Sequence, residues 1–172
     1  GEIRPVKGAL PIAIYMQKTR KNKLILPKEN ASEAAVVEDI EVYPVRNLVE
    51  AVGFISGDIP IKAYKINIEE LLKGISNYEI DFSDVKGQYL AKRALEIAAS
   101  GSHNLLFIGP PGAGKTMLAK RLPTILPDMT LEECLDTTKI YSVTGFLSTK
   151  QALVINRPFR AVHHTASDIA LV

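Results

Sequence analysis

The chain has 172 residues, of which 47% are hydrophobic and 23% are charged, and its formal net charge is +2. This composition is typical of a globular protein rather than a disordered one, and so small a net charge does not by itself indicate a nucleic-acid partner. The single cysteine, Cys134, excludes an intramolecular disulfide framework and a cysteine-rich zinc site, and it fits a reducing, cytoplasmic location. We expect no membrane span, because no apolar run reaches the roughly 18 residues that a span needs. The chain starts at Gly1 and stops within an apolar stretch at Val172, so we expect it to be an internal piece of a longer protein.

The first 54 residues alternate short helix and strand patterns. The spacing of their apolar residues predicts helices over 8–20, 31–37 and 47–52, the last capped by Asn47, and strands over 23–26 and 40–43. Asn30 or Ser32 would cap the second helix, and Gly53 would end the third. Pro27 and Pro44 would close the two strands. Such a series is typical of a small α/β layer.

Residues 55–80 have a different character. They include Gly57 and Pro60 among scattered apolar residues, and one short stretch, 67–73, has helical spacing. We interpret 55–80 as a linker that packs on a neighbour.

Residues 81–172 return to regular patterns. The spacing predicts helices over 88–99, 116–122 and 131–135, a buried parallel strand over 104–108, and strand or hairpin segments over 150–155 and 159–162. Gly101 would cap the first of these helices at its C-terminus, and Pro123 would stop the second. Thr130 and Glu133 have the spacing of a capping box for the third.

A phosphate-binding motif, G-x-x-x-x-G-K-[ST], lies between the predicted strand and the helix that follows it. It consists of Gly109, Pro110, Pro111, Gly112, Ala113, Gly114, Lys115 and Thr116. The glycines allow a tight turn around a phosphate, and consecutive N–H groups of the loop bind its oxygens. Lys115 would contact the β- and γ-phosphates, and the Thr116 hydroxyl would ligate Mg²⁺. The sequence therefore predicts a nucleoside triphosphate site; a glycine-rich turn with a chance lysine is the weaker alternative.

Segments around this loop carry a family resemblance. Residues 81–88, Asp-Phe-Ser-Asp-Val-Lys-Gly-Gln, resemble the stretch that opens the ATPase domain of AAA+ proteins, although an ordinary helix start is the alternative. Together with 91–99 and 103–112 they closely resemble the magnesium-chelatase-like AAA+ family, and within it the YifB/ComM group. The resemblance implies that ATP is the nucleotide. It also implies ATP contacts beyond the loop, from Val85, Gly87 and Gln88 on the adenine side and from Met117.

Residues 156–167 match a further signature of the same family, Arg-Pro-Phe-Arg-x-Pro-His-His, except that Val162 replaces a proline. Its cationic and imidazole side chains are Arg157, Arg160, His163 and His164. Three interpretations stay open: a pore-facing loop that contacts DNA, a metal site, and a structural network beside the phosphate loop. Adjacent histidines in a strand point to opposite faces, and Asp168 is the only nearby carboxylate, which argues against a metal.

The N-terminal region carries a second resemblance. Segments 1–8, 24–30 and 41–45 look like the second half of a Lon-protease-type domain, which precedes the ATPase module in the YifB/ComM group. In Lon the catalytic lysine follows the glycine that matches Gly8 by a few residues, whereas positions 9–12 contain no lysine. A serine nucleophile needs a base to activate it, so we expect a non-proteolytic domain, with an active peptidase as the alternative.

The sequence after the loop has no convincing acidic Walker B strand. Hydrolysis needs acidic residues that hold Mg²⁺ and orient the attacking water. Glu38 and Asp39 follow an apolar run but precede the loop, so we interpret them as a solvated turn. The resemblance implies that Walker B, the sensor and the arginine finger follow Val172. We therefore expect this chain not to turn over ATP by itself.

The sequence thus predicts an α/β protein in three parts. These are a partial Lon-protease-like (ribosomal S5 domain 2-like) domain at 1–54, a linker at 55–80 and the N-terminal half of a P-loop AAA+ domain with a parallel sheet at 81–172. The resemblance implies a parent AAA+ ATPase that binds ATP·Mg²⁺ between the subunits of a homo-hexamer. It also implies DNA remodelling, as a helicase or branch-migration motor in competence, DNA uptake and recombination. A magnesium-chelatase motor subunit and a protein-remodelling AAA+ chaperone remain alternatives.

Overall fold

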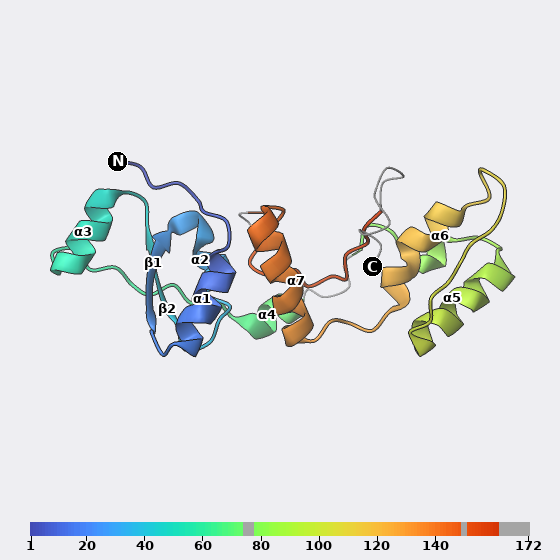
Figure 1. Ribbon diagram of the computed structural model, residues 1–172, viewed down its shortest axis with the longest axis horizontal. Helices are drawn as coiled ribbons and strands as arrows, with labels where there is room; N and C mark the ends of the chain where they lie inside the picture. Colours follow the sequence, from blue (N-terminus) through green and yellow to red (C-terminus); the bar gives the residue numbers. More distant parts are fainter. Residues whose placement is uncertain (74–77, 149–150, 162–172) are drawn as a thin grey trace. The chain divides into compact units, whose positions relative to one another are not determined.

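The computed structural model describes residues 1–73, 78–148 and 151–161, and the chain divides into two compact units (Figure 1). Unit 1 contains Gly1–Ile75 and Met129–Ile155, and unit 2 contains Ser76–Asp128 and Asn156–Val172. Residues 129–155 therefore belong to the same unit as the N-terminal region, although residues of unit 2 precede and follow them in the chain. The three-part division drawn from the sequence stays a prediction.

Unit 1 is built on a two-stranded parallel sheet. Strand β1 (Lys23–Pro27) pairs with β2 (Glu41–Val45) along the full length of both. Both predicted strands and the small α/β layer are confirmed. The prediction that Pro27 and Pro44 stand just outside the strands is wrong, because both lie inside them. Each strand of a two-stranded sheet is an edge strand, on which the missing N–H of a proline is tolerated.

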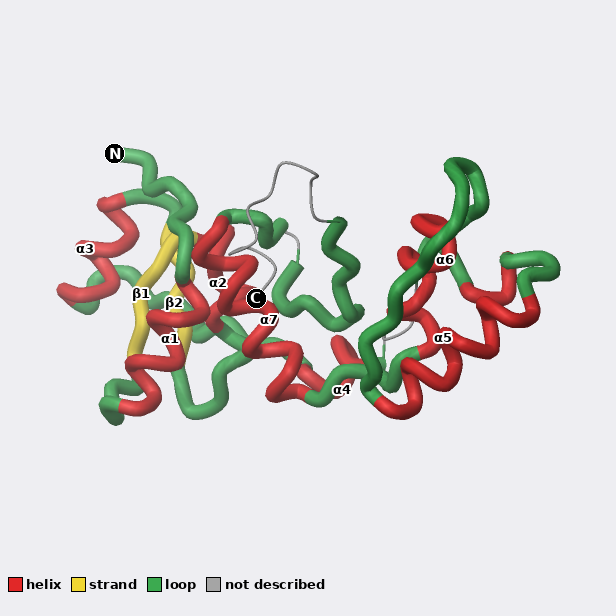
Figure 2. The backbone as a smooth tube through the Cα atoms, turned by 45° about the vertical axis from the view of Figure 1, so that its right-hand side comes forward, coloured by secondary structure: helices red, strands yellow, loops and turns green. Residues whose placement is uncertain are grey.

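Helices make up most of the rest of unit 1 (Figure 2). They are α1 (Ala9–Lys18), α2 (Ala31–Ala34), α3 (Leu48–Ser56), α4 (Ile68–Leu72) and α7 (Leu131–Thr144), with a 3-10 turn, η1, at Lys28–Asn30. Helix α3 lies on one side of the sheet, where the rings of Tyr43 and Phe54 are 4.5 Å apart, and α1 and α2 lie on the other. The helices predicted over 8–20 and 67–73 are confirmed as α1 and α4.

The core of unit 1 lies between the sheet, α1, α2 and α7. Its buried members are Leu10, Ala13, Leu26, Ala31, Ala34, Val36, Val37, Val42, Met129, Cys134, Ala152, Leu153 and Val154. The Thr138 hydroxyl on α7 donates to the carbonyl of Cys134 (2.6 Å) and accepts the N–H of Val154 (2.8 Å). This buried hydroxyl ties the segment after α7 to the same core.

The predicted end of α3 is wrong. Gly53 lies inside the helix, which continues to Ser56, and Gly57 ends it with a φ of +89°. A β-carbon at Gly53 would come within 2.6 Å of Ile59, so this glycine serves close packing rather than termination. The Asn47 cap is confirmed, since its side chain accepts the N–H of Glu50.

Two other helix lengths differ from the prediction. Helix α2 stops at Ala34 rather than at residue 37, and Asn30 occupies its N-cap position without a side-chain capping bond. Helix α7 runs to Thr144, well past the predicted end, although its capping box of Thr130 and Glu133 is confirmed. The segment with Glu38 and Asp39 is an exposed turn, as expected.

Unit 2 is helical in its described part. It contains α5 (Tyr89–Gly101), α6 (Lys115–Arg121) and two 3-10 turns, η2 (Phe82–Asp84) and η3 (Leu122–Ile125). The core holds Phe82, Val85, Leu95 and Leu118, with partly buried Phe107 and Met117 beside them. The helix predicted over 88–99 is confirmed as α5, but its expected C-cap, Gly101, is the last helical residue, and Ser102 adopts the left-handed cap conformation.

The parallel strand predicted over 104–108 is wrong in this structure. The segment is irregular, and Leu106 and Ile108 are 81% and 89% exposed. A parallel strand needs neighbours to pair with its backbone, and in the described residues the only sheet is β1–β2. The strands predicted over 150–155 and 159–162 are likewise not found within 151–161; Lys150 and Val162 lie outside the described residues.

Candidate nucleotide-binding site

In unit 2 the loop motif leads into α6, whose first two residues are Lys115 and Thr116 of the motif. Gly112 and Gly114 both have a φ of +81°, a left-handed conformation that glycine adopts without strain. Ala113 donates its N–H to the carbonyl of Pro110 (3.3 Å), which closes the turn. Leu118 then donates to the carbonyl of Gly114 (2.9 Å), which starts the helix. The two glycines thus allow the backbone to turn and enter α6 within a few residues.

The Lys115 side chain folds back over this loop. Its ammonium donates to the carbonyls of Gly109 and Pro110, both at 2.8 Å. The positively charged ammonium of Lys115 therefore lies over the loop backbone, hydrogen-bonded to two neutral carbonyl oxygens. Phosphate oxygens are charged acceptors and form stronger hydrogen bonds with an ammonium than carbonyls do. Thr116 is exposed at the start of α6, so the residues present fit a phosphate group with its Mg²⁺.

The segment 81–88 lies beside the loop. The side-chain amide of Gln88 donates to the carbonyl of Ala113 (3.3 Å), and Gly87 turns with a φ of +64°. Val85 is buried in the core of unit 2, so its side chain is a packing group. The structure thus brings the predicted adenine-side segment and the predicted phosphate loop together through Gln88.

The space around Gly114 is narrow. A β-carbon at this position would lie 3.2 Å from the Met117 methyl and 3.8 Å from the Gln88 amide nitrogen. Met117, the remaining predicted ATP contact, is half-buried against the core of unit 2. The positive φ of Gly114 favours glycine here, and a β-carbon would also require the flexible end of the Met117 side chain to shift slightly.

Two cations that sequence analysis missed hold the 81–88 segment in place. Lys92 on α5 donates to the carbonyl of Val85 (3.1 Å), and Arg121 on α6 donates to the carbonyl of Asp81 (2.9 Å). The Arg121 contact joins residues 40 positions apart, so no local pattern could have indicated it. Lys92 lies seven residues after its acceptor, across the turn that precedes α5.

The structure describes two of the four cationic and imidazole residues predicted at 157–164, Arg157 and Arg160, and their surroundings differ. The Arg157 guanidinium donates to the carbonyl of Pro127 (2.7 Å), and its backbone N–H donates to the hydroxyl of Tyr78 (3.0 Å). These contacts favour a structural role for Arg157 among the three open interpretations. Arg160 is exposed. His163 and His164 lie outside the described residues, as does Asp168.

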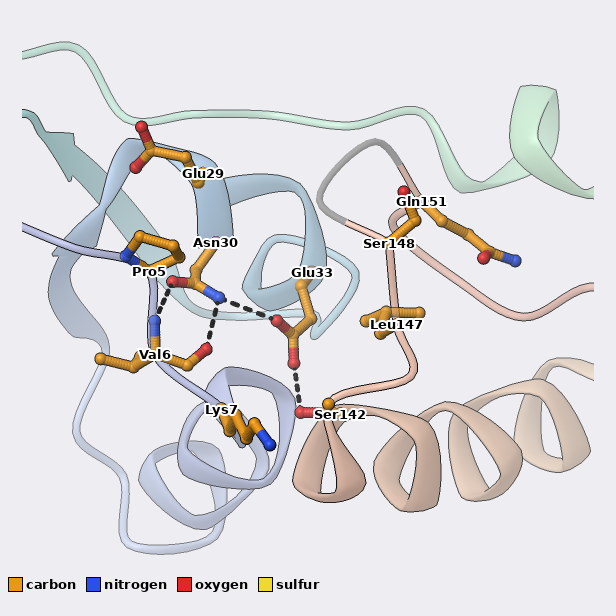
Figure 3. Close-up of a pocket in the computed structure, with 11 residues that line it drawn as sticks. Pro5, Val6, Lys7, Glu29, Asn30, Glu33, Ser142, Leu147, Ser148 and Gln151 are labelled. Atoms are coloured by element: carbon orange, nitrogen blue, oxygen red, sulfur yellow. Dashed lines mark hydrogen bonds between the residues drawn. The ribbon is translucent and has the colours of Figure 1, made fainter.

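Unit 1 contains a separate polar cluster beside a cavity of about 230 Å³ (Figure 3). The buried carboxylate of Glu33 accepts hydrogen bonds from the Leu10 N–H (3.0 Å), the Ser142 hydroxyl and the Asn30 amide (3.2 Å). Asn30 also bonds both backbone groups of Val6 at 2.9 Å. The cluster joins α1, α2 and α7 and lies next to positions 9–12, where the Lon-protease family carries its catalytic lysine.

Within the described ranges, no group of three or more His, Cys, Asp or Glu side chains is arranged to hold a metal ion. The helices of the same ranges are all too short or too polar to cross a membrane.

Comparisons with known proteins place this sequence in a family. The family model described as magnesium chelatase, subunit ChlI, matches residues 81–172, which include the loop and the segment beside it. Over the whole chain, the sequence is 44% identical to competence protein ComM of Haemophilus influenzae and 37% identical to YifB of Escherichia coli. An archaeal Lon protease of Halobacterium salinarum is 31% identical over 119 residues, 63% of this chain and 16% of that protein.

The chain belongs to the magnesium-chelatase-like family that includes ComM and YifB. It spans about a third of the length of these relatives, 34% of ComM and 33% of YifB.

Proposed function

We propose that this chain binds ATP·Mg²⁺ in unit 2. The loop from Gly109 to Thr116 would hold the phosphates, with Lys115 on the β- and γ-phosphates and Thr116 on the metal. The 81–88 segment would contact the adenine through backbone groups around Gly87 and through Gln88. Family membership supports nucleotide and Mg²⁺ use, since the match covers both segments.

The observation that carries this proposal is the position of the Lys115 ammonium. It lies 2.8 Å from two carbonyls at the start of the loop, above a turn formed by two glycines of positive φ. Neutral carbonyls compensate a full positive charge only partly, and phosphate oxygens would compensate it better.

The direct test is equilibrium binding of ATP with Mg²⁺ to the protein and to two lysine variants. Lys115→Ala removes the ammonium, and we expect the affinity to fall by about tenfold to a hundredfold, since a hydrogen bond to a charged group contributes about 1.5–3 kcal/mol. Lys120→Ala, an exposed lysine on the same helix, is the matched control and should bind ATP normally. Equal affinities for both variants would contradict the proposal.

For the whole protein we propose an AAA+ ATPase that assembles as a homo-hexamer and remodels DNA. The ComM relative is named a competence protein, which supports a role in DNA handling. A magnesium-chelatase motor and a protein-remodelling chaperone are the alternatives. Binding of the whole protein to DNA over a range of salt concentrations distinguishes DNA remodelling from both alternatives, because phosphate contacts make the affinity for DNA fall steeply as salt is added. No binding at low salt would exclude the DNA function.

We further propose that residues 1–54 form part of a Lon-protease-like domain without peptidase activity, joined by 55–80 to the P-loop AAA+ domain. The similarity to an archaeal Lon protease supports the domain type. The lack of a lysine at 9–12 supports the loss of peptidase activity, because a serine nucleophile needs a base to activate it. Cleavage of an unfolded protein substrate by the whole protein would contradict this proposal.

A further inference from the structure

The segment 81–88 has little secondary structure of its own. Its one regular feature is the turn η2, closed by a reciprocal pair of bonds at its start. The Ser83 N–H donates to the Asp81 carboxylate, and the Asp81 N–H donates to the Asp84 carboxylate, both at 2.8 Å. Such a turn is stable locally, but these bonds do not determine where it lies relative to the phosphate loop.

Arg121 links this turn to α6. Its guanidinium donates from three nitrogens to three acceptors: the carbonyl of Asp81 (2.9 Å), the carbonyl of Met117 (3.3 Å) and the carboxylate of Asp84 (3.4 Å). The Arg121 side chain is 16% exposed, whereas that of Asp84 is 51% exposed. Only a planar guanidinium presents a rigid fork of donors that can serve three such acceptors at once.

Neighbouring contacts also anchor the segment 81–88 to the helices around it. The Phe82 N–H donates to the Thr124 hydroxyl on η3 (3.1 Å), and that hydroxyl donates to the Arg121 carbonyl (2.8 Å). On α5, the Lys92 ammonium bonds the Val85 carbonyl and lies 5.2 Å from the centre of the Phe82 ring. The turn is thus anchored to the helix that follows the phosphate loop, and the middle of the segment is anchored to α5.

We propose that Arg121 is a positioning residue for the nucleoside end of the bound nucleotide. It holds residues 81–84 against α6 and thereby keeps Gln88, whose amide bonds the Ala113 carbonyl, beside the loop. This inference rests on the proposed ATP site. Arg121 itself bonds protein groups rather than the nucleotide, so its loss would weaken nucleoside recognition and leave phosphate binding by Lys115 intact.

The test compares two ligands that share the phosphate chain, ATP and inorganic tripolyphosphate, each with Mg²⁺. For Arg121→Met we expect about a tenfold loss of affinity for ATP and little change for tripolyphosphate, so the ratio of the two affinities falls by about tenfold. Arg93→Met is the matched control, because Arg93 is 70% exposed on α5 and pairs with Glu96 within its own helix. Its ratio should equal that of the unmodified protein.

A second variant keeps the test decisive if Arg121→Met does not fold. Thr124→Val removes the acceptor for the Phe82 N–H and keeps the side-chain volume, and it should lower the same ratio by a smaller factor. An unchanged ratio of the two affinities in the folded variants would overturn the positioning role of Arg121, and so would an equal fall in the affinities for both ligands. Either result would leave the proposed ATP site standing. If the unmodified protein bound neither ligand, the proposed ATP site would fail, and the positioning role would fail with it.

Discussion

The two units differ in how their structure is supported. In unit 1 a parallel sheet and several helices share one continuous buried core. In the described part of unit 2, four buried side chains form the core. The motif with the clearest chemistry nevertheless lies in unit 2. The difference indicates that the loop motif at 109–116 depends on local glycine geometry, whereas a stable α/β layer depends on burial contributed by distant segments.

The strongest test of this comparison is Leu10→Ala. Leu10 is fully buried in the core of unit 1, so we expect the free energy of unfolding of unit 1 to fall by about 3 kcal/mol. Urea denaturation followed by circular dichroism measures this loss, and ATP titration should give an unchanged affinity. The control, Ile12→Ala, changes a half-exposed residue of the same helix and should have a much smaller effect. If Leu10→Ala weakened ATP binding as well as the stability of unit 1, the two units would depend on a single core.

A smaller effect is expected for Glu33→Leu. The substitution leaves three donors, on Leu10, Asn30 and Ser142, without their acceptor, and we expect unit 1 to lose about 2 kcal/mol of stability. Glu29→Leu changes an exposed glutamate nearby and serves as the control in the same denaturation experiment. Replacing a buried charge with an apolar group sometimes stabilises a protein, so a neutral or stabilising result would mean that this cluster does not support the core.

Thr130→Ala tests where α7 belongs. Loss of an N-cap side chain costs about 1 kcal/mol of stability. We expect the two units to unfold in separate transitions, of which ATP stabilises only that of unit 2. Because α7 packs in unit 1, the loss should lower the stability of the unit 1 transition. Asp136→Ala removes a surface pair with Lys139 on the same helix and should cost only about 0.3 kcal/mol. If the ATP-stabilised transition moved instead, α7 would belong with the nucleotide unit, as its position within 81–172 first suggested.

The smallest expected effect concerns acid stability in unit 2. Hydrogen bonds from Ser83, first from its side chain and then from its backbone, hold the pKa of Asp81 below its ordinary value, and the charge of Arg121 lowers it further. Because the folded pKa is the lower one, this stabilisation is present above the ordinary carboxyl pKa and is lost as the pH falls through the folded pKa, below about pH 4.

Thermal unfolding between pH 7 and pH 3 measures this dependence. The ATP-responsive transition should lose stability below about pH 4 in the unmodified protein and less so in Asp81→Asn. Glu96→Gln, an exposed carboxylate on α5, is the control and should keep the full dependence. Identical profiles for all three proteins would show that the Asp81 turn does not contribute to the pH dependence.

Local signals in the sequence determined much of the structure. Apolar spacing predicted both strands of unit 1, and side-chain oxygens at Asn47 and Thr130 predicted two helix caps, since a cap depends on residues within one turn. The phosphate motif likewise specifies its own loop, because Gly112 and Gly114 adopt positive φ without strain. These features require only neighbours in sequence.

Tertiary structure decided what depends on distant neighbours. Gly53 looked like a helix end, but contact with Ile59 makes it an internal packing position. The apolar run at 104–108 looked like a strand, but a strand forms only where another backbone pairs with it. The positions of α7 in unit 1 and of Arg121 beside Asp81 follow from contacts between residues far apart in the chain. The sequence by itself determined the glycine-rich turn of the loop motif and the family, while packing decided how the surrounding segments are held.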